Sequence, residues 1–144
     1  MQGKCLCGEV EFAVSGDLPN IYQCHCSLCR KATGSISNSA LIVSSEHFQW
    51  VRGHERITSY VKETGYRTDF CSKCGSPLPN PIKDGTQYWI PAGLLDDKAA
   101  IEIAAHLHVG SKASWDEVAP NGVQYQEAPD LESLLKVLQQ KAGA

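Results

Sequence analysis

Two short cysteine stretches decide the fold: Cys5-Leu6-Cys7-Gly8 near the start of the chain and Cys71-Ser72-Lys73-Cys74-Gly75 in its middle. Two thiolates separated by one or two residues can converge on one ion when the backbone turns beside them. In each stretch a glycine follows the second cysteine, where a positive φ angle tightens such a turn. Together the pairs supply four sulfur ligands, which fill a tetrahedral site and leave no open position. The spacing therefore predicts a structural zinc ion held by Cys5, Cys7, Cys71 and Cys74.

A second group of cysteines, Cys24, Cys26 and Cys29, has no fourth cysteine left to join it. Three protein ligands and one vacancy are typical of a catalytic zinc, because water or substrate can enter the fourth position. Three thiolates on a divalent ion leave one negative charge, which favours a soft ligand such as a thiol at the vacancy. Arg30 and Lys31 follow directly and are candidates to offset this charge or to bind an anionic substrate.

Other interpretations of the cysteines stay open at this point. The trio is also compatible with a second structural ion whose fourth ligand is His25, His106 or His108. His25 lies between two ligands, so we expect its side chain to point away from their metal, whereas His106 and His108 are expected on a solvent-facing side of one strand. A thioredoxin-type redox role for Cys71 and Cys74 lacks the expected βαβ context. A single cluster of all seven cysteines is disfavoured by their separation.

Length, charge and cysteine usage limit the class of protein. The 144 residues fall within the roughly 100–200 expected of one domain. The formal net charge is −3 and no basic block occurs, so the surface has no general attraction for nucleic acid or anionic lipid. The seven cysteines cannot all pair internally, and no stretch resembles a membrane span or a secretory signal. We expect a cytoplasmic protein without nucleic-acid or membrane partners.

Hydrophobic patterning predicts a mainly β fold with one clear helix. Apolar residues alternate at 10–14 and, most clearly, at 101–109, as in half-buried strands. Further short strands are expected at 40–43, 48–52, 57–61, 67–70 and 87–90, a helical turn at 27–32, and loops at 92–97 and 110–123. Three prolines at alternate positions favour an extended loop at 77–81. A helix is predicted from Asp130 to Ala142, ended by Gly143, with its leucines at 131, 134, 135 and 138 facing the core.

The ordered motifs resemble a known family. They are Cys5-x-Cys7-Gly8, Cys24-His25-Cys26-x-x-Cys29-Arg30-Lys31-x-x-Gly34-Ser35, Phe70-Cys71-x-x-Cys74-Gly75-Ser76-Pro77-Leu78, Ala92-Gly93-x-Leu95-Asp96-Asp97 and His106-x-x-Val109-Gly110-Ser111-Lys112-x-x-Trp115. In this set the chain resembles the glutathione-dependent formaldehyde-activating enzymes, whose domain is shared with centromere protein V, over about residues 3–120. The resemblance implies a β-tent fold, with small curled antiparallel sheets around the four-cysteine zinc, in a single domain spanning 1–144. It also implies two zinc ions, the structural one on the four cysteines and a catalytic one on the trio.

The activity implied by the resemblance is a carbon–sulfur bond step classed with lyases. Glutathione and formaldehyde would combine as S-hydroxymethylglutathione, with Arg30 or Lys31 meeting the carboxylates of glutathione. Leu78-Pro79-Asn80-Pro81 departs from the aromatic or small residues of the family and is expected to reshape the pocket wall. The alternative is a non-catalytic zinc-binding scaffold or interaction module. The vacancy at the trio favours the enzyme.

Overall fold

The computed structural model describes residues 1–96 and 100–140. Two compact units are present, and each contains two separate parts of the chain. Unit 1 comprises Met1–Leu18 and Ile42–Ala99, and unit 2 comprises Pro19–Leu41 and Ala100–Ala144. The chain returns from unit 2 to unit 1 within a single strand, β4 (Asn38–Ser44). In the described ranges the chain is mainly β, as predicted, with small and mostly antiparallel sheets and two α-helices.

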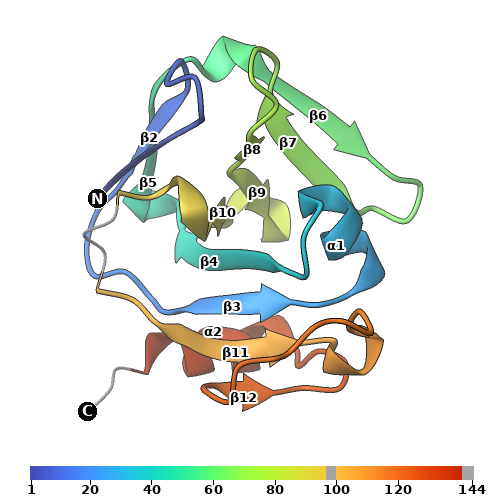
Figure 1. Cartoon of the computed structure of the whole chain (residues 1–144). Helices are drawn as coiled ribbons and strands as arrows, with labels where there is room; N and C mark the ends of the chain where they lie inside the picture. Colours follow the sequence, from blue (N-terminus) through green and yellow to red (C-terminus); the bar gives the residue numbers. More distant parts are fainter. Residues whose placement is uncertain (97–99, 141–144) are drawn as a thin grey trace. The chain divides into compact units, whose positions relative to one another are not determined.

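Unit 1 contains two antiparallel sheets of three strands each (Figure 1). The first has the order β1 (Gln2–Lys4), β2 (Glu11–Val14), β5 (Phe48–Arg52). The second has the order β6 (Ile57–Val61), β7 (Arg67–Cys71), β8 (Pro77–Leu78). The alternation predicted at 10–14 is confirmed, since Val10, Phe12 and Val14 are buried. Val10 and Leu78 pack with Cys5 and Cys71 in one core cluster, so the first cysteine of each pair lies in the core of this unit.

The predicted loop at 77–81 is wrong, because this segment forms two short strands. β8 pairs with β7, and β9 (Asn80–Ile82) pairs antiparallel with β10 (Gln87–Pro91). β8 and β9 each stand last in the strand order of their sheet. A strand at an edge needs hydrogen bonds on one side only, so it tolerates prolines that lack an N–H donor.

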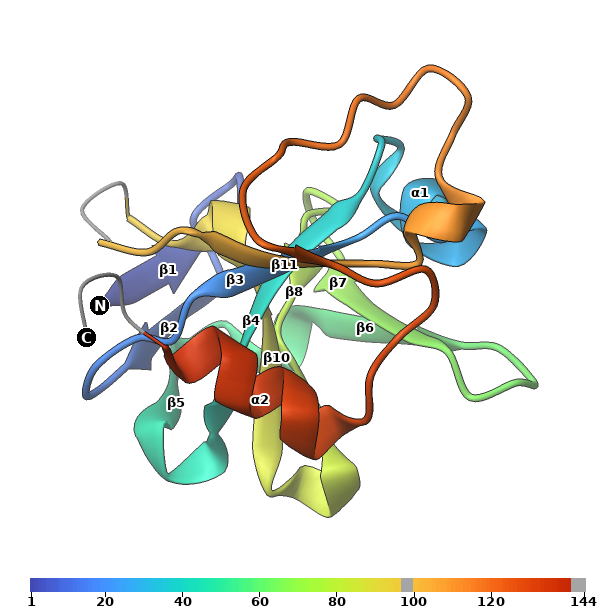
Figure 2. The same cartoon turned by 90° about the horizontal axis from the view of Figure 1, so that it is seen from below.

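Unit 2 contains four consecutive strands of a six-stranded sheet, in the order β12 (Val123–Gln124), β11 (Ile103–Leu107), β3 (Ile21–Cys24), β4. β11 runs parallel to both of its neighbours, and β3 and β4 are antiparallel. Helix α1 (Ser27–Thr33) follows β3, where the sequence predicted a helical turn. Helix α2 (Leu131–Gln139) lies against β11, as Figure 2 shows from below. Leu134 and Leu138 of the predicted apolar stripe are buried.

Several predicted boundaries shift. The strand expected at 101–109 is confined to β11, and α2 ends at Gln139. The predicted helix end at Ala142 and Gly143, and Asp97 of the expected loop, lie outside the described residues. Five 3₁₀ turns complete the secondary structure of the described ranges: Ser45–His47, His54–Arg56, Lys83–Gly85, Ala92–Leu94 and Val109–Ser111. Within those ranges, no helix combines the length and apolar character required to cross a bilayer.

Candidate metal centres

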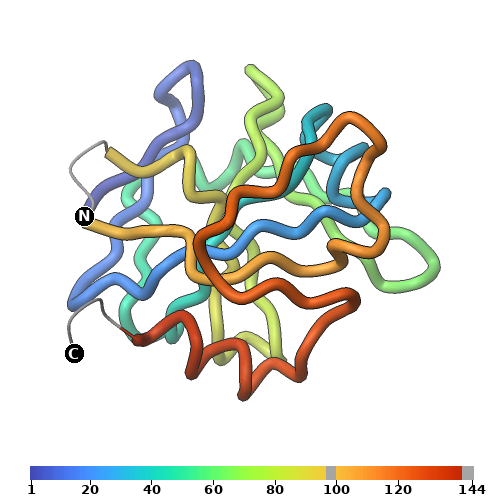
Figure 3. Tube along the Cα trace, turned by 60° about the horizontal axis from the view of Figure 1, so that its bottom comes forward, coloured from blue at the N-terminus to red at the C-terminus, as the bar shows by residue number. Residues whose placement is uncertain are grey.

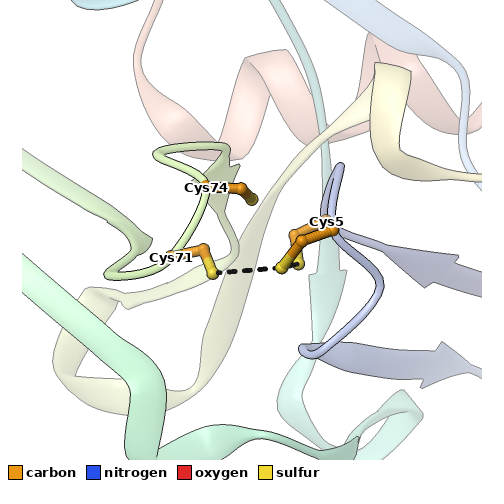
Figure 4. A group of neighbouring side chains, drawn as sticks. Cys5, Cys71 and Cys74 are labelled. Carbon is orange, nitrogen blue, oxygen red and sulfur yellow. Dashed lines mark hydrogen bonds between the residues drawn. The ribbon is translucent and has the colours of Figure 1, made fainter.

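The four cysteines predicted to form one site come together in unit 1. The Sγ atoms of Cys5, Cys7, Cys71 and Cys74 all lie within 4.8 Å of one another. Sγ of Cys7 lies 3.5 Å from Sγ of Cys5 and 3.9 Å from Sγ of Cys71. Figure 4 shows the labelled side chains reaching toward one another from two separate segments. Sulfurs in a tetrahedral zinc site stand about 3.8 Å apart, because each Zn–S bond is about 2.3 Å. The observed spacing therefore fits such an ion.

The glycines after each pair adopt the backbone conformation that the sequence predicted. Gly8 has φ 80° and Gly75 has φ 79°, both in the left-handed region. The N–H of Gly8 donates to the carbonyl of Cys5 at 3.0 Å, and the N–H of Gly75 donates to that of Cys71 at 2.8 Å. Each turn thereby brings its two cysteines to the same side.

Side chains that the sequence analysis missed connect the two cysteine segments. The N–H of Leu6 donates to Oγ of Ser76 at 2.9 Å, although 70 positions separate them. Glu9 forms an ion pair with Lys73 at 2.6 Å and another with Arg56.

The hydroxyl and the backbone N–H of Ser76 lower the pKa of Cys74 to about 5. The backbone N–H of Glu9 acts to lower the pKa of Cys7, but desolvation and the neighbouring thiols outweigh it and raise that pKa to about 11. The thiolate that a metal ion requires is thus favoured at Cys74 and disfavoured at Cys7.

The three-cysteine group forms at the junction of β3 and α1 in unit 2. Cys24 is the last residue of β3, Cys26 caps the helix, and Cys29 lies in its first turn. Their Sγ atoms lie within 4.8 Å of one another, and Sγ of Cys26 accepts from the N–H of Cys29 at 3.4 Å. The side chain of Cys29 and the backbone N–H of Cys26 lower the pKa of Cys24. Among residues 1–96 and 100–140, no fourth His, Cys, Asp or Glu joins this group.

Two of the three histidines considered as a fourth ligand, His25 and His106, have other partners. Nδ1 of His25 lies 2.6 Å from Asp116 Oδ2, and its Nε2 lies 3.0 Å from Nδ1 of His106. Nε2 of His106 lies 3.0 Å from the carbonyl oxygen of Asn121. The expectation that His106 faces solvent is wrong: it is completely buried, because its ring contacts His25 and the carbonyl of Asn121 in the segment that follows β11. His108 does not share a strand face with it, since β11 ends at Leu107 and His108 has φ 55°.

Basic side chains lie beside the trio on α1. Nη2 of Arg30 donates to the carbonyl oxygen of Ser111 at 3.4 Å, which links α1 to the segment after β11. Figure 3 shows these two segments side by side. Nε of Arg30 is buried and finds no hydrogen-bond partner in the described part of the chain. Lys31 is exposed.

Asp116 and Asn121 are the residues of this region that the sequence analysis missed. Asp116 contacts a histidine 91 positions earlier in the chain, and local spacing carries no information about that contact. The only sequence signal is its place directly after Trp115, the last residue of the fifth motif.

Comparisons with known proteins agree with these features. The family model described as "Glutathione-dependent formaldehyde-activating enzyme" matches residues 1–111. A Halomonas elongata protein that is provisionally named a glutathione-dependent formaldehyde-activating enzyme is 32% identical over 126 residues, covering 82% of this chain and 80% of that protein. The crystal structure of a Rhodobacter sphaeroides protein is similar with a TM-score of 0.57 and 25% identity, and the match covers 72% of this chain and 100% of the other.

The family match includes all seven cysteines and both groups that could hold metal ions. It also covers most of the chain, as does the relative from Halomonas elongata. The chain therefore belongs to the glutathione-dependent formaldehyde-activating enzyme family.

Proposed function

We propose that the protein binds two zinc ions with different roles. Cys5, Cys7, Cys71 and Cys74 hold a structural ion, because four thiolates complete a tetrahedral shell. Cys24, Cys26 and Cys29 hold a catalytic ion whose fourth position is open to substrate. The thiol-only composition of both groups supports a thiophilic metal such as zinc. None of the seven cysteines forms a disulfide, in keeping with a reducing, cytoplasmic location.

The proposed reaction is a carbon–sulfur bond step of the lyase type on a thiol substrate. Glutathione and formaldehyde are the pair indicated by family membership: the glutathione sulfur adds to the carbonyl carbon, a proton goes to the oxygen, and S-hydroxymethylglutathione results. Zinc bound by the trio would keep the substrate thiol deprotonated at neutral pH. One observation carries this proposal: three convergent thiols lack a fourth protein ligand among the described residues, and both nitrogens of His25 and His106 are engaged elsewhere.

The chain's own residues are assigned binding and orienting roles. Arg30 binds a carboxylate of the substrate, because its guanidinium lies on the helix of the trio and its buried Nε is unpartnered within the described ranges. The Cys26 side chain is partly exposed, so it marks the side from which a small thiol reaches the open position. The family match at 1–111 crosses both compact units, and we propose that they act as one domain.

Metal stoichiometry and sulfur counting test this proposal. We expect two zinc equivalents per chain, with X-ray absorption giving an average of three and a half sulfurs per zinc, since sites of four and three contribute equally. Glutathione should raise that average to four. Cys26→Ser should bind one equivalent, remain folded and lose thiol-dependent activity. Ser27→Ala, an exposed neighbour, serves as the matched control.

The scaffold alternative predicts a different result. A protein side chain would complete the shell of the second ion, and glutathione would then leave the sulfur count unchanged. A single zinc equivalent in wild-type protein that has never met a chelator would contradict the assignment of the trio.

A further inference from the structure

A line of buried hydrogen bonds runs through unit 2 beside the trio. It connects Asp116 Oδ2, His25 Nδ1, His25 Nε2, His106 Nδ1, His106 Nε2 and the carbonyl oxygen of Asn121, at 2.6, 3.0 and 3.0 Å in turn. His25 is 1% exposed, His106 0% and Asp116 4%. The three side chains thus form one enclosed cluster, which the metal assignments do not use.

The partners fix where the protons lie. A carbonyl oxygen only accepts, so His106 Nε2 carries a hydrogen. Burial lowers the pKa of His106, which leaves its Nδ1 as an acceptor. His25 Nε2 must then donate to His106, and His25 Nδ1 faces Asp116 across a bond that holds one proton. Both nitrogens of His25 are therefore committed, and its ring has a single orientation.

This cluster contributes little to the stability of the fold compared with apolar packing. Oδ1 of Asp116 is buried and has no hydrogen-bond partner among residues 1–96 and 100–140. An unsatisfied buried oxygen destabilises the folded state, because it has lost its hydrogen bonds to water. Ion pairs in the interior gain little over apolar packing. A role beyond general stability is the better explanation of the cluster.

The neighbour that such a role would serve is the trio. His25 is bonded on one side to Cys24 and on the other to Cys26, and its N–H donates to the carbonyl of Leu107 at 2.9 Å. Asp116 is itself held in place, because its N–H donates to Ala113 at 3.1 Å and its carbonyl accepts from Lys112 Nζ at 3.2 Å. Because the His25 ring is fixed at both nitrogens, it restrains the backbone on either side, and with it the positions of Cys24 and Cys26.

We propose that Asp116 is a positioning residue for the three-cysteine metal site, acting by holding His25 between two of its ligands. The inference rests on the proposed function, since it requires that the trio bind a metal ion. Mutation of a residue that orients a ligand from outside the coordination shell typically lowers metal affinity by about 10–100-fold.

Competitive chelation of the metal-loaded protein tests the inference. Zinc is withdrawn from wild type, Asp116→Ala and Asp116→Asn with a chromophoric chelator, and the step belonging to the trio is identified by its absence in Cys26→Ser. Asp116→Ala should lower the zinc affinity of the trio by about 10–100-fold and leave the zinc affinity of the four-cysteine group unchanged. In Asp116→Asn the amide N–H can donate to His25 Nδ1, so affinity should stay within about tenfold of wild type.

Cobalt(II) provides the readout that a purely structural role would not move. Its thiolate charge-transfer and ligand-field bands should change in Asp116→Ala only for the cobalt bound at the trio. Asp130→Ala, which removes the N-cap of α2 in the same unit, is the matched control and should leave affinity and bands unchanged.

The outcomes separate the inference from the proposed function. Unaltered affinity and bands in Asp116→Ala overturn the positioning role while the metal assignment stands. Equal weakening of both sites, or failure of Asp116→Asn to restore affinity, overturns it as well. If chelation of the wild-type protein shows no step of zinc withdrawal from the trio, both the positioning role and the proposed function are overturned.

Discussion

Arg30 combines a positive charge with a buried nitrogen that has no partner in the described part of the chain, and it lies one residue after Cys29. An anionic substrate would supply the missing acceptor through a charge-assisted hydrogen bond. Arg30→Ala should therefore raise the KM for glutathione by roughly 10–100-fold, corresponding to about 1.5–3 kcal/mol, while both metal equivalents are retained. Steady-state kinetics and metal analysis of the same sample measure the two effects.

Lys31→Ala is the natural control for that substitution, because Lys31 is the neighbouring basic residue and is exposed. It should shift KM much less, and the small shift should fade with added salt. Equal effects of both substitutions would indicate general attraction by positive charge rather than a bond to Arg30.

Prediction from sequence succeeded for geometry that depends on local spacing. The cysteine pairs and Gly8 and Gly75 belong to this class, since ligand geometry and positive φ act over a few residues. His106 was misplaced because alternation assumes that one side of a strand meets water, whereas His25 and the segment carrying Asn121 cover that side of β11. Asp116 was missed because its contact depends on tertiary structure.

At the scale of an element, the N-terminus of α2 is capped by one polar side chain. The carboxylate of Asp130 accepts from the N–H of Ser133 at 3.1 Å, and this interaction lowers the pKa of Asp130. A group whose pKa falls on folding stabilises the folded state above its unfolded pKa of about 3.9, and that contribution disappears as pH falls through the lowered value. Asp130→Asn keeps an acceptor but has no charge.

The free energy of unfolding should accordingly be larger for wild type than for Asp130→Asn. This difference should be constant from pH 7 to about pH 5 and shrink below about pH 4. Thermal unfolding of both proteins across this range measures the difference, and effects common to both, such as acid release of metal, cancel. An advantage that grows on acidification would show that the carboxylate does not cap the helix in its charged form.

Elements with a strong internal pattern were predicted closely. β5 and β6 match their expected bounds, since alternation or a following glycine defines each. The two strands at 77–82 were predicted as loop because proline argues against a central strand and says little about an edge. Sequence pattern also gave no means of predicting that β11 is parallel to its neighbours, because that arrangement depends on long connections.

At the scale of the whole molecule, the four-cysteine group joins two segments of unit 1 that are far apart in sequence. Zinc bound by such a group contributes on the order of 10 kcal/mol to folding, comparable with the net stability of a typical domain. Cys71→Ser removes a buried thiol of this group and should abolish the fixed tertiary structure of unit 1 at room temperature. Near-ultraviolet circular dichroism and an amide NMR spectrum provide the measurement.

Ser72→Ala, at an exposed position inside the same turn, is expected to behave like wild type. A Cys71→Ser protein that melts at the wild-type temperature would refute the structural assignment. Chelation of wild type should give the same loss of structure as Cys71→Ser, whereas Cys26→Ser should not.

The insertion of residues 19–41 of unit 2 between the two parts of unit 1 has a consequence for biosynthesis. Cys7 leaves the ribosome 64 residues ahead of Cys71, its partner in the folded protein. During that interval the first cysteine pair is exposed to oxidants, and the nascent chain has no means of closing its first unit. Translation speed and the thiol balance of the cell during synthesis should therefore influence how much correctly folded protein is made.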